Sequence, residues 1–365
     1  MGDPPTIPPL RASVCREFTL KDIARLARVS VSTVSRSLND SPLIPARTRD
    51  RIRRIAERKG FEFNAHARSL VTRRVGTIGI ILPSDYDRFS VNLYHGTLHN
   101  ALRDVLERSD IDLIVAFLAN RFTGRDNVRK LVTRKKVDGL IIVHPVPGGA
   151  LVDSLLDAGI PFVFSHYPPS PSCRDDVDLV YPDNELGGYL AARRLAAQGR
   201  RRIACVATGG DPAGSDAEYS LRLDGFRRGL AETGNGVAPT VLAAPEPTIG
   251  AGYDAIGVLG AGADTVDGVF AMNDLLAIGA VTALRERGRD VPGDVSVIGY
   301  DDTELAASWK PSLTTIHQPR EELSTATCEL LVDLISRRRA GGLPVRAAVG
   351  RRVVLAPTLV VRETG

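Results

Sequence analysis

Apolar residues near the start of the chain recur at the spacing of two short helices within residues 19–38. Thr19 is a candidate N-cap of the first helix, and Ser30 can cap the second. Val34 and Leu38 lie four residues apart and predict the inner face of the second helix. The residues left on its outer face are Val31, Ser32, Ser35 and Arg36. Two helices joined by a tight turn, the second presenting polar side chains, form an arrangement that can enter a major groove.

A third helix is predicted from about Ala46 to Lys59, because Pro45 precedes it and Gly60 follows it as a C-cap. An apolar stripe predicts its inner face, and six arginines are expected to face outward. The stripe is Ile52, Ile55 and Ala56, and the arginines are Arg47, Arg49, Arg51, Arg53, Arg54 and Arg58.

The pattern changes after Val75, where short apolar runs alternate with longer helical segments. This alternation is typical of parallel sheets with helices on both faces. Because about 285 residues are more than one core usually holds, we expect two lobes. The predicted strands lie near residues 77–83, 112–117, 139–143, 161–164, 202–206, 268–271 and 295–299. The expected fold is a small all-α helix-turn-helix headpiece followed by a two-lobed α/β domain.

The composition is that of an ordinary globular protein, with 43% apolar and 25% charged residues among 365. No run approaches the ~20 apolar residues that span a membrane. The four cysteines have no paired spacing, which argues against a disulfide or zinc framework and favours the cytoplasm. Residues 1–17 carry four prolines and no apolar core, so they predict a disordered lead rather than a signal peptide.

The formal net charge of +4 is unevenly distributed. Between Arg11 and Gly76 there are 16 Lys and Arg against 6 Asp and Glu, a net charge of +10. The rest of the chain, with 31 basic and 37 acidic side chains, carries −6. Basic residues concentrated on a helix-turn-helix indicate a polyanionic partner, for which counterion release supplies much of the affinity.

Motifs of several common enzyme classes are missing from the sequence. It contains no P-loop, no GxSxG elbow, no HExxH and no GxGxxG opening a strand–helix unit. The glycines of residues 209–214 predict a turn rather than a phosphate cradle. We therefore expect no catalytic residues, no metal and no cofactor. An α/β enzyme and a solute-binding protein are the alternatives from other classes.

The string TLKDIARLARVSVSTVSRSLND, residues 19–40, closely resembles the DNA-binding headpiece of the LacI family of bacterial transcription repressors. Further landmarks of that family are KVDGLI at 136–141, FAMND at 270–274, IGYDD at 298–302 and LTTIHQP at 313–319. The resemblance implies a type I periplasmic-binding-protein-like fold for the body. It also implies a repressor that binds a near-palindromic double-stranded operator as a homodimer and responds to a small-molecule effector between its lobes.

By this resemblance, the headpiece contacts phosphates, bases and the minor groove with different residues. Hydroxyl and amide groups suit phosphates, Arg suits guanine, Val suits a thymine methyl, and an apolar wedge suits the minor groove. The implied phosphate contacts are Thr19, Ser30, Thr33, Ser35, Asn39 and Thr48. The implied base contacts are Val31, Ser32 and Arg36, and the implied hinge-helix contacts are Asn64, Ala67 and Leu70. Phe63 stands where the family usually has proline at the hinge entry.

The resemblance also implies an effector site. Asn273 and Asp301 match polar pocket positions of the family, and Phe89 matches an apolar wall. His166 stands where many members have Asp, and Ser220 stands where many have an Arg two residues before the arginine of the RLxGF-like string. Because both departures remove groups that hold sugar hydroxyls, a sugar, another metabolite and an empty site are all open.

The implied domains are a lead (1–17), the headpiece (18–60), a hinge helix and linker (61–75) and an effector-binding and dimerisation domain (76–365). Crossings near Val180, His317 and Val345 would divide that domain into a first lobe, 76–180 and 318–345, and a second lobe, 181–317 and 346–365. Since the chain ends at Gly365, soon after its last predicted strand, we expect a dimer rather than a tetramer. We expect it in the cytoplasm, on the nucleoid when bound to DNA, and without a membrane partner.

Overall fold

The computed structural model describes residues 18–38, 41–61, 75–82, 89–120, 122–143, 150–169, 173, 175–208, 217–233, 238–260, 265–340 and 349–365, without the side chains of 89–95 and 339. The chain divides into two compact units, Met1–Val75 and Gly76–Gly365. No helix in the described part of the chain is long and apolar enough to cross a membrane.

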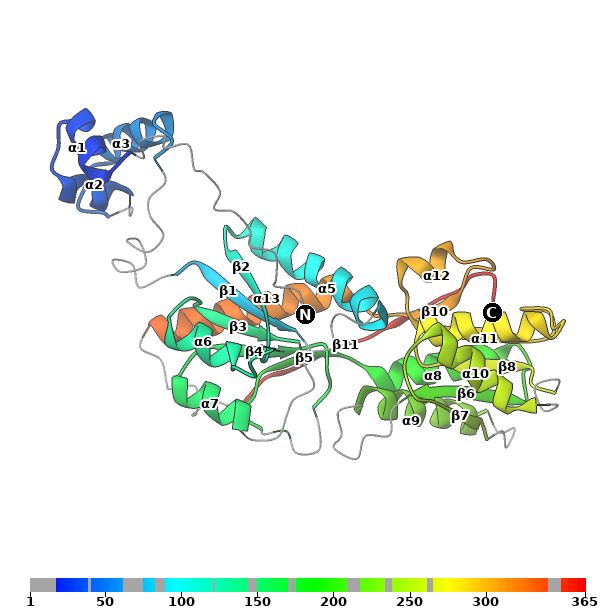
Figure 1. The fold of residues 1–365 in the computed structure, drawn as a ribbon. Coiled ribbons are helices and arrows are strands. Elements are labelled where there is room, and N and C mark those ends of the chain that lie inside the picture. The colour runs from blue at the N-terminus through cyan, green and yellow to red at the C-terminus, as the bar shows by residue number, and fades with distance from the viewer. Residues whose placement is uncertain are drawn as a thin grey trace, which may run out of the picture. The chain divides into compact units, whose positions relative to one another are not determined.

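The first unit consists, in its described residues, of helices α1 (Leu20–Ala27), α2 (Val31–Leu38) and α3 (Ala46–Arg58) (Figure 1). One side chain from each helix, Ile23, Val34 and Ile52, is fully buried where the three helices meet. The predicted helices are therefore confirmed, and α3 ends where Gly60 takes a left-handed conformation (φ 59°).

The second unit contains two six-stranded sheets. The first has the order β11-β5-β4-β3-β1-β2, with all neighbours parallel. Its strands are β1 (Thr77–Leu82), β2 (Asp112–Phe117), β3 (Gly139–Ile142), β4 (Phe162–Ser165), β5 (Leu179–Pro182) and β11 (Arg352–Leu355). The side chains of alternate strand residues pack against opposite layers, so both faces of this sheet are apolar.

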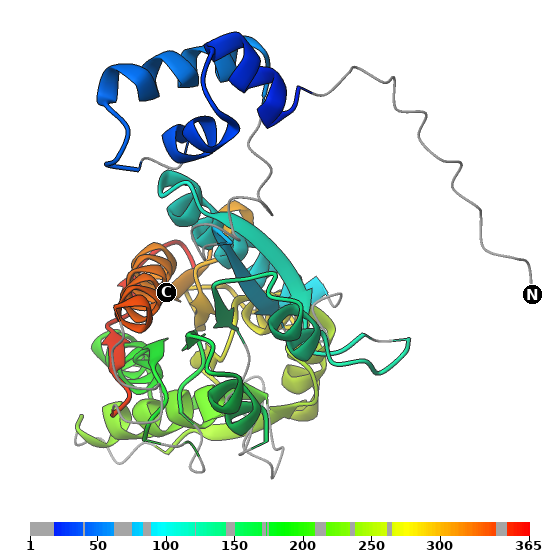
Figure 2. The ribbon, with the colours of Figure 1, turned by 90° about the vertical axis from the view of Figure 1, so that its left-hand side faces the viewer.

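Helices cover both faces of the first sheet. They are α5 (Phe89–Arg108), α6 (Asn127–Thr133), α7 (Ala150–Ala158) and α13 (Arg320–Arg339). Helices α5 and α13 share a core with Ile78 and Ile80, whereas α6 and α7 share the opposite core with Ile81. Figure 2 views this unit from the side of the first sheet, with α13 in orange.

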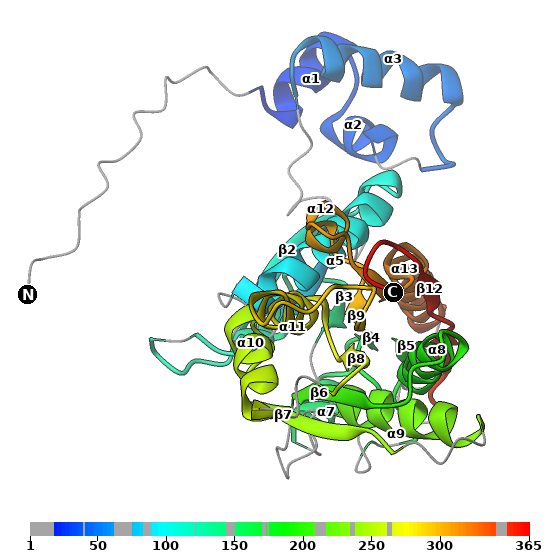
Figure 3. The same cartoon turned by 90° about the vertical axis from the view of Figure 1, so that its right-hand side faces the viewer.

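The second sheet has the order β12-β10-β9-β8-β6-β7, parallel except for β12 against β10. Its strands are β6 (Ile203–Thr208), β7 (Thr240–Ala244), β8 (Gly268–Ala271), β9 (Ser296–Asp301), β10 (Thr314–His317) and β12 (Thr358–Val360). Its helices are α8 (Asn184–Ala197), α9 (Ala217–Ala231), α10 (Ile249–Val258), α11 (Asp274–Glu286) and α12 (Glu304–Ser308). Helices α8 and α9 cover one face and α10 and α11 the other (Figure 3). The two-lobed α/β fold is confirmed.

The lobe boundaries need two corrections. β11 pairs in parallel with β5, so residues 352–355 belong to the first sheet, and the third crossing lies between Leu355 and Thr358 rather than near Val345. The first crossing follows Pro182, because β5 continues past Val180 to that residue. The second agrees with the expected place, since β10 ends at His317 and α13 packs against the first sheet. The sequence of a short edge strand does not show which of the two sheets it joins, because pairing with a strand far away in the chain decides this.

Candidate DNA interface and effector site

A capping box begins the first helix of the headpiece. The Asp22 amide donates to Thr19 Oγ1 at 3.4 Å, and the Thr19 amide donates to Asp22 Oδ2 at 3.0 Å. This arrangement satisfies two backbone donors at the helix start, and it confirms the predicted N-cap. The helix ends at Ala27, and its C-cap Arg28 is left-handed (φ 50°) and makes the tight turn into α2.

Helix α2 presents a polar face opposite its buried Val34. The Thr33 amide donates to Ser30 Oγ at 3.1 Å, so Ser30 caps the helix as expected. Of the predicted base-reading residues, Val31 is 40% exposed, and Ser32 and Arg36 are exposed as well. Among the predicted phosphate contacts, Thr33, Ser35 and Thr48 are half-buried and Thr19 is exposed.

The six arginines of α3 were predicted to face outward; four of them are exposed, and Arg49 and Arg53 are half-buried. Arg51 Nη2 donates to the carbonyl oxygen of Ala27 at 3.0 Å, and Arg49 Nη1 donates to the carbonyl oxygen of Ser41 at 3.3 Å. Arg51 thereby satisfies a carbonyl in the last turn of α1, which a helix leaves without an internal partner. Arg51 therefore links α3 to α1, and Arg49 links α3 to the loop that precedes it.

Four predicted DNA-contacting residues, Asn39, Asn64, Ala67 and Leu70, lie outside the described residues. The lead over 1–17 lies outside them too, as does the side chain of Phe89, the first residue of α5.

In the second lobe, polar side chains meet at the carboxyl ends of β8 and β9. Arg222 of α9 is 5% exposed, and its Nε donates to Asn184 Oδ1 at 2.9 Å. Its Nη1 donates to the Met272 carbonyl at 2.6 Å and lies 4.0 Å from Asp301 Oδ1. The guanidinium carbon lies 3.7 Å from the ring centroid of Tyr300, a cation–π contact. The carboxyl ends of parallel strands are where open α/β sheets bind ligands.

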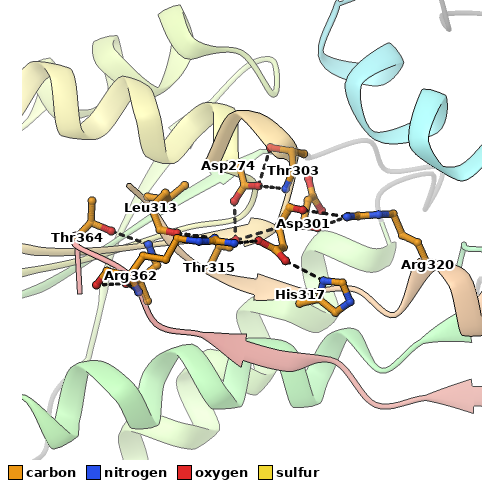
Figure 4. A network of polar contacts seen from close by, with 11 residues as sticks. Asp274, Asp301, Thr303, Leu313, Thr315, His317, Arg320, Arg362 and Thr364 are labelled. Carbon is orange, nitrogen blue, oxygen red and sulfur yellow. Dashed lines mark hydrogen bonds and ion pairs between the residues drawn. The ribbon is translucent and has the colours of Figure 1, made fainter. Parts of the chain in front are cut away.

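Asp301, the last residue of β9, and Asp302, which follows it, form a strained turn with φ of 110° and 53°. Thr315 and Thr303 hydrogen-bond to Asp274, which lies beneath the turn: Thr315 Oγ1 donates to its Oδ1 at 2.6 Å and the Thr303 amide to its Oδ2 at 2.7 Å. Figure 4 shows these contacts. Burial and the nearby Asp301 carboxylate raise the pKa of Asp274 to about 7, and burial also raises the pKa of Asp301.

Asn273 and Ser220 occupy different surroundings. Asn273 Oδ1 accepts the Leu276 amide at 2.8 Å, so this buried side chain caps α11. Ser220 is exposed on α9, whereas Arg222, two residues on, lies in the buried cluster. Arg222 was not among the predicted site residues, and its basic side chain one turn before the apolar Phe226 is a local signal that could have indicated it.

His166 lies at the carboxyl end of β4 in the first lobe, is buried, and has a φ of 75°. Thr327 Oγ1 donates to the Leu323 carbonyl at 2.7 Å, so it accepts the hydroxyl hydrogen of Ser165 over 2.7 Å. Ser165 Oγ then accepts from His166 Nδ1 over 2.6 Å. Because each hydroxyl has one hydrogen, this series of hydrogen bonds places a proton on Nδ1 of the His166 ring.

A three-helix unit with an exposed polar second helix, and a two-lobed α/β unit with a polar cluster at its strand ends, define a regulator with a DNA-binding head and a ligand-binding body. The family profile described as Bacterial regulatory proteins, lacI family, matches residues 19–64. The profile described as Periplasmic binding protein-like domain matches residues 192–364.

The HTH-type transcriptional regulator CelR of Thermobifida fusca is 32% identical over 356 residues, which cover 96% of this chain and 99% of CelR. The solved transcriptional regulator CelR–cellobiose complex is 29% identical, with a TM-score of 0.64, over 96% of this chain and 100% of that one. The Lac repressor dimer bound to operator and the anti-inducer ONPF is 25% identical, with a TM-score of 0.75, over 96% and 99%. The chain belongs to the LacI family of bacterial transcriptional regulators.

Proposed function

We propose that the chain represses transcription by reading a near-palindromic operator with α2, as a homodimer, and that a hydroxyl-rich metabolite bound at Arg222 and Asp301 changes its operator affinity. The observation that carries the proposal is the exposed face of Val31, Ser32 and Arg36 on a helix whose opposite side is fixed in the core. A similar solved structure, the Lac repressor dimer, is bound to operator, which supports operator binding as a dimer.

The effector class follows from the groups in the cluster. Arg222 supplies hydrogen-bond donors and Asp301 an acceptor, and both are fixed by other contacts. Side-chain pairs of this kind bind hydroxyl groups, as in a sugar. A related regulator was solved with cellobiose, which supports a sugar despite His166 and Ser220. We therefore place a sugar ahead of other metabolites.

We further propose where the protein acts and that it acts without a reaction step. A regulator that binds operator DNA acts in the cytoplasm, on the nucleoid. The cluster at Arg222 and Asp301 is assigned to reversible binding, so the protein acts on its target by occupancy rather than by catalysis.

Selection of bound sequences from a random duplex pool, with and without cellobiose, ribose, glucose or lactose, tests this proposal. We expect a palindromic consensus for the native chain and a change in its occupancy with one sugar. Arg36→Ala should relax preference at one position of each half-site and cost about 1–3 kcal/mol.

The matched control is Arg54→Ala, which removes an exposed arginine from α3 and should weaken binding uniformly across sequences. If Arg36→Ala kept the native consensus and affinity, the assignment of α2 to base reading would be wrong. If none of the sugars changed the occupancy of the consensus, the proposed effector class would be refuted, whereas the assignment of α2 to DNA binding would be kept.

A further inference from the structure

Asp301 and Asp302 both adopt positive φ, a conformation that is strained for non-glycine residues and persists only when neighbours fix it. From the second lobe, Arg362 Nη2 donates to Asp302 Oδ1 at 2.6 Å, and His317 Nδ1 lies 2.9 Å from Asp302 Oδ2. The Asp274 carboxylate fixes the next residue, Thr303.

The first lobe also fixes this turn, through the start of α13. Arg320, the first residue of α13, donates from Nη1 to the carbonyl oxygen of Asp301 and from Nη2 to that of Asp302 at 2.9 Å. Gln318 Nε2, just before the helix, donates to Asp301 Oδ1 at 2.7 Å. Figure 4 shows Arg320 reaching the turn from α13. A ligand hydroxyl that binds Asp301 Oδ1 must therefore share this oxygen with Gln318, or displace it.

Two turns further on, the same helix contacts Ser165, the neighbour of the first-lobe candidate residue His166. Thr327 Oγ1 accepts from Ser165, which in turn accepts from His166 Nδ1. Between the two contacts, Leu323 is fully buried in the core of the first sheet. Because a packed helix moves as one piece, a shift at Arg320 is carried to the Ser165–His166 end of β4.

We infer that α13 mechanically links the two halves of the effector site, with Arg320 and Thr327 as positioning residues for Asp301 and His166. The inference rests on the proposed effector site and adds the element that couples its two lobes. Neither residue is assigned a contact with the effector. Their loss should therefore change how effector binding reaches the operator more than it changes effector affinity itself.

The test compares Arg320→Met and Thr327→Val with the native full-length chain. Met keeps much of the Arg320 stem without its donors, and Val keeps the shape of Thr327 without its hydroxyl. The control is Arg337→Met on the same helix, because Arg337 is 67% exposed and pairs with Asp333 one turn away.

The first readout is amide hydrogen exchange without any sugar. The Thr303 amide should exchange about tenfold faster in Arg320→Met, and the His166 amide in Thr327→Val, with neither change in Arg337→Met. Exchange equal to that of the control in both variants would overturn the positioning roles. Because this readout requires no sugar, it tests the positioning roles of Arg320 and Thr327 even if the proposed effector site is wrong.

The second readout is the ratio of operator Kd with and without the sugar that acts on the native chain, together with sugar affinity by calorimetry. Coupling ratios of this kind are typically about 5–150-fold. We expect the ratio to fall toward 1 in both variants while sugar affinity changes by less than about threefold, and Arg320→Lys to restore part of it. A native ratio in Arg320→Met would refute the link.

Discussion

Replacing Gly188 by Ala tests the contact that positions Arg222. Helices α8 and α9 approach so closely that a Cβ atom on Gly188 would lie 1.9 Å from the Arg222 carbonyl oxygen. On the facing helix, a Cβ on Gly225 would lie 1.8 Å from the Glu185 carbonyl oxygen. Real Cβ atoms do not approach within 3.0 Å, so Gly188→Ala requires the backbones to separate by about 1.1 Å.

The expected cost comes from this separation. Overpacking a tight core costs about 1–3 kcal/mol, and here the obstacle is backbone, which cannot rotate away. The higher helix propensity of Ala returns at most about 1 kcal/mol. With the overpacking cost at the upper end of its range, about 3 kcal/mol, the net loss in the free energy of unfolding is about 2–3 kcal/mol, which corresponds to a Tm lower by roughly 5–10 °C. The displaced Arg222 should also weaken any sugar response.

Thermal denaturation of the full chain measures this loss, with Gly257→Ala as the matched control. Gly257 is an exposed glycine of α10, and a Cβ there meets no atom within 4 Å. The control should be as stable as the native chain or up to about 1 kcal/mol more stable. A Gly188→Ala variant that melts with the native chain would refute the close packing of α8 on α9.

Two further predictions concern the carboxyl pair of the second lobe. The pKa of Asp274, about 7 in the fold, lies above its ordinary value, so the native state keeps a proton that the unfolded chain releases. This contribution to the free energy of unfolding is full below about pH 4 and is lost as pH rises to about 7. In Asp274→Asn the contribution should be absent. Denaturant titrations of both proteins between pH 4 and 8 should therefore give a difference in the free energy of unfolding that changes with pH. A constant difference would contradict the shifted pKa. Asp301→Ala should abolish the sugar-dependent change in operator affinity, measured by fluorescence anisotropy, while a preserved response would move the effector site elsewhere.

Local signals in the sequence predicted the headpiece well because its structure is local. The caps at Thr19 and Ser30 act over three residues, and the left-handed Gly60 follows α3 directly. The buried strands could be predicted for a similar reason, since a strand covered on both faces is a continuous apolar run, as in β1.

The parts that sequence reasoning missed depend on contacts between distant residues. Arg222 became a site candidate only because β8, β9 and α8 enclose it, and the sequence drew attention to the neighbouring Ser220 instead. Asn273 fits both a helix cap and a ligand contact by sequence, and the structure shows the cap. From the sequence, Arg51 is expected to be a surface cation, and its hydrogen bond to the carbonyl of Ala27 can be seen only once α1 is packed beside α3.

The distance between Arg222 and Asp301 is itself an argument for a ligand with hydroxyl groups. A closed charge-assisted hydrogen bond is about 2.7–2.9 Å long, whereas Nη1 of Arg222 and Oδ1 of Asp301 are 4.0 Å apart. Neither group can relax to close this distance, because Asn184 and the Met272 carbonyl hold the arginine and Gln318 holds the carboxylate. A hydroxyl can accept from the arginine and donate to the carboxylate at once, with both partners already in place. Such preorganisation lowers the cost of binding, and it favours an uncharged, hydroxyl-bearing ligand over a carboxylate, which Asp301 would repel.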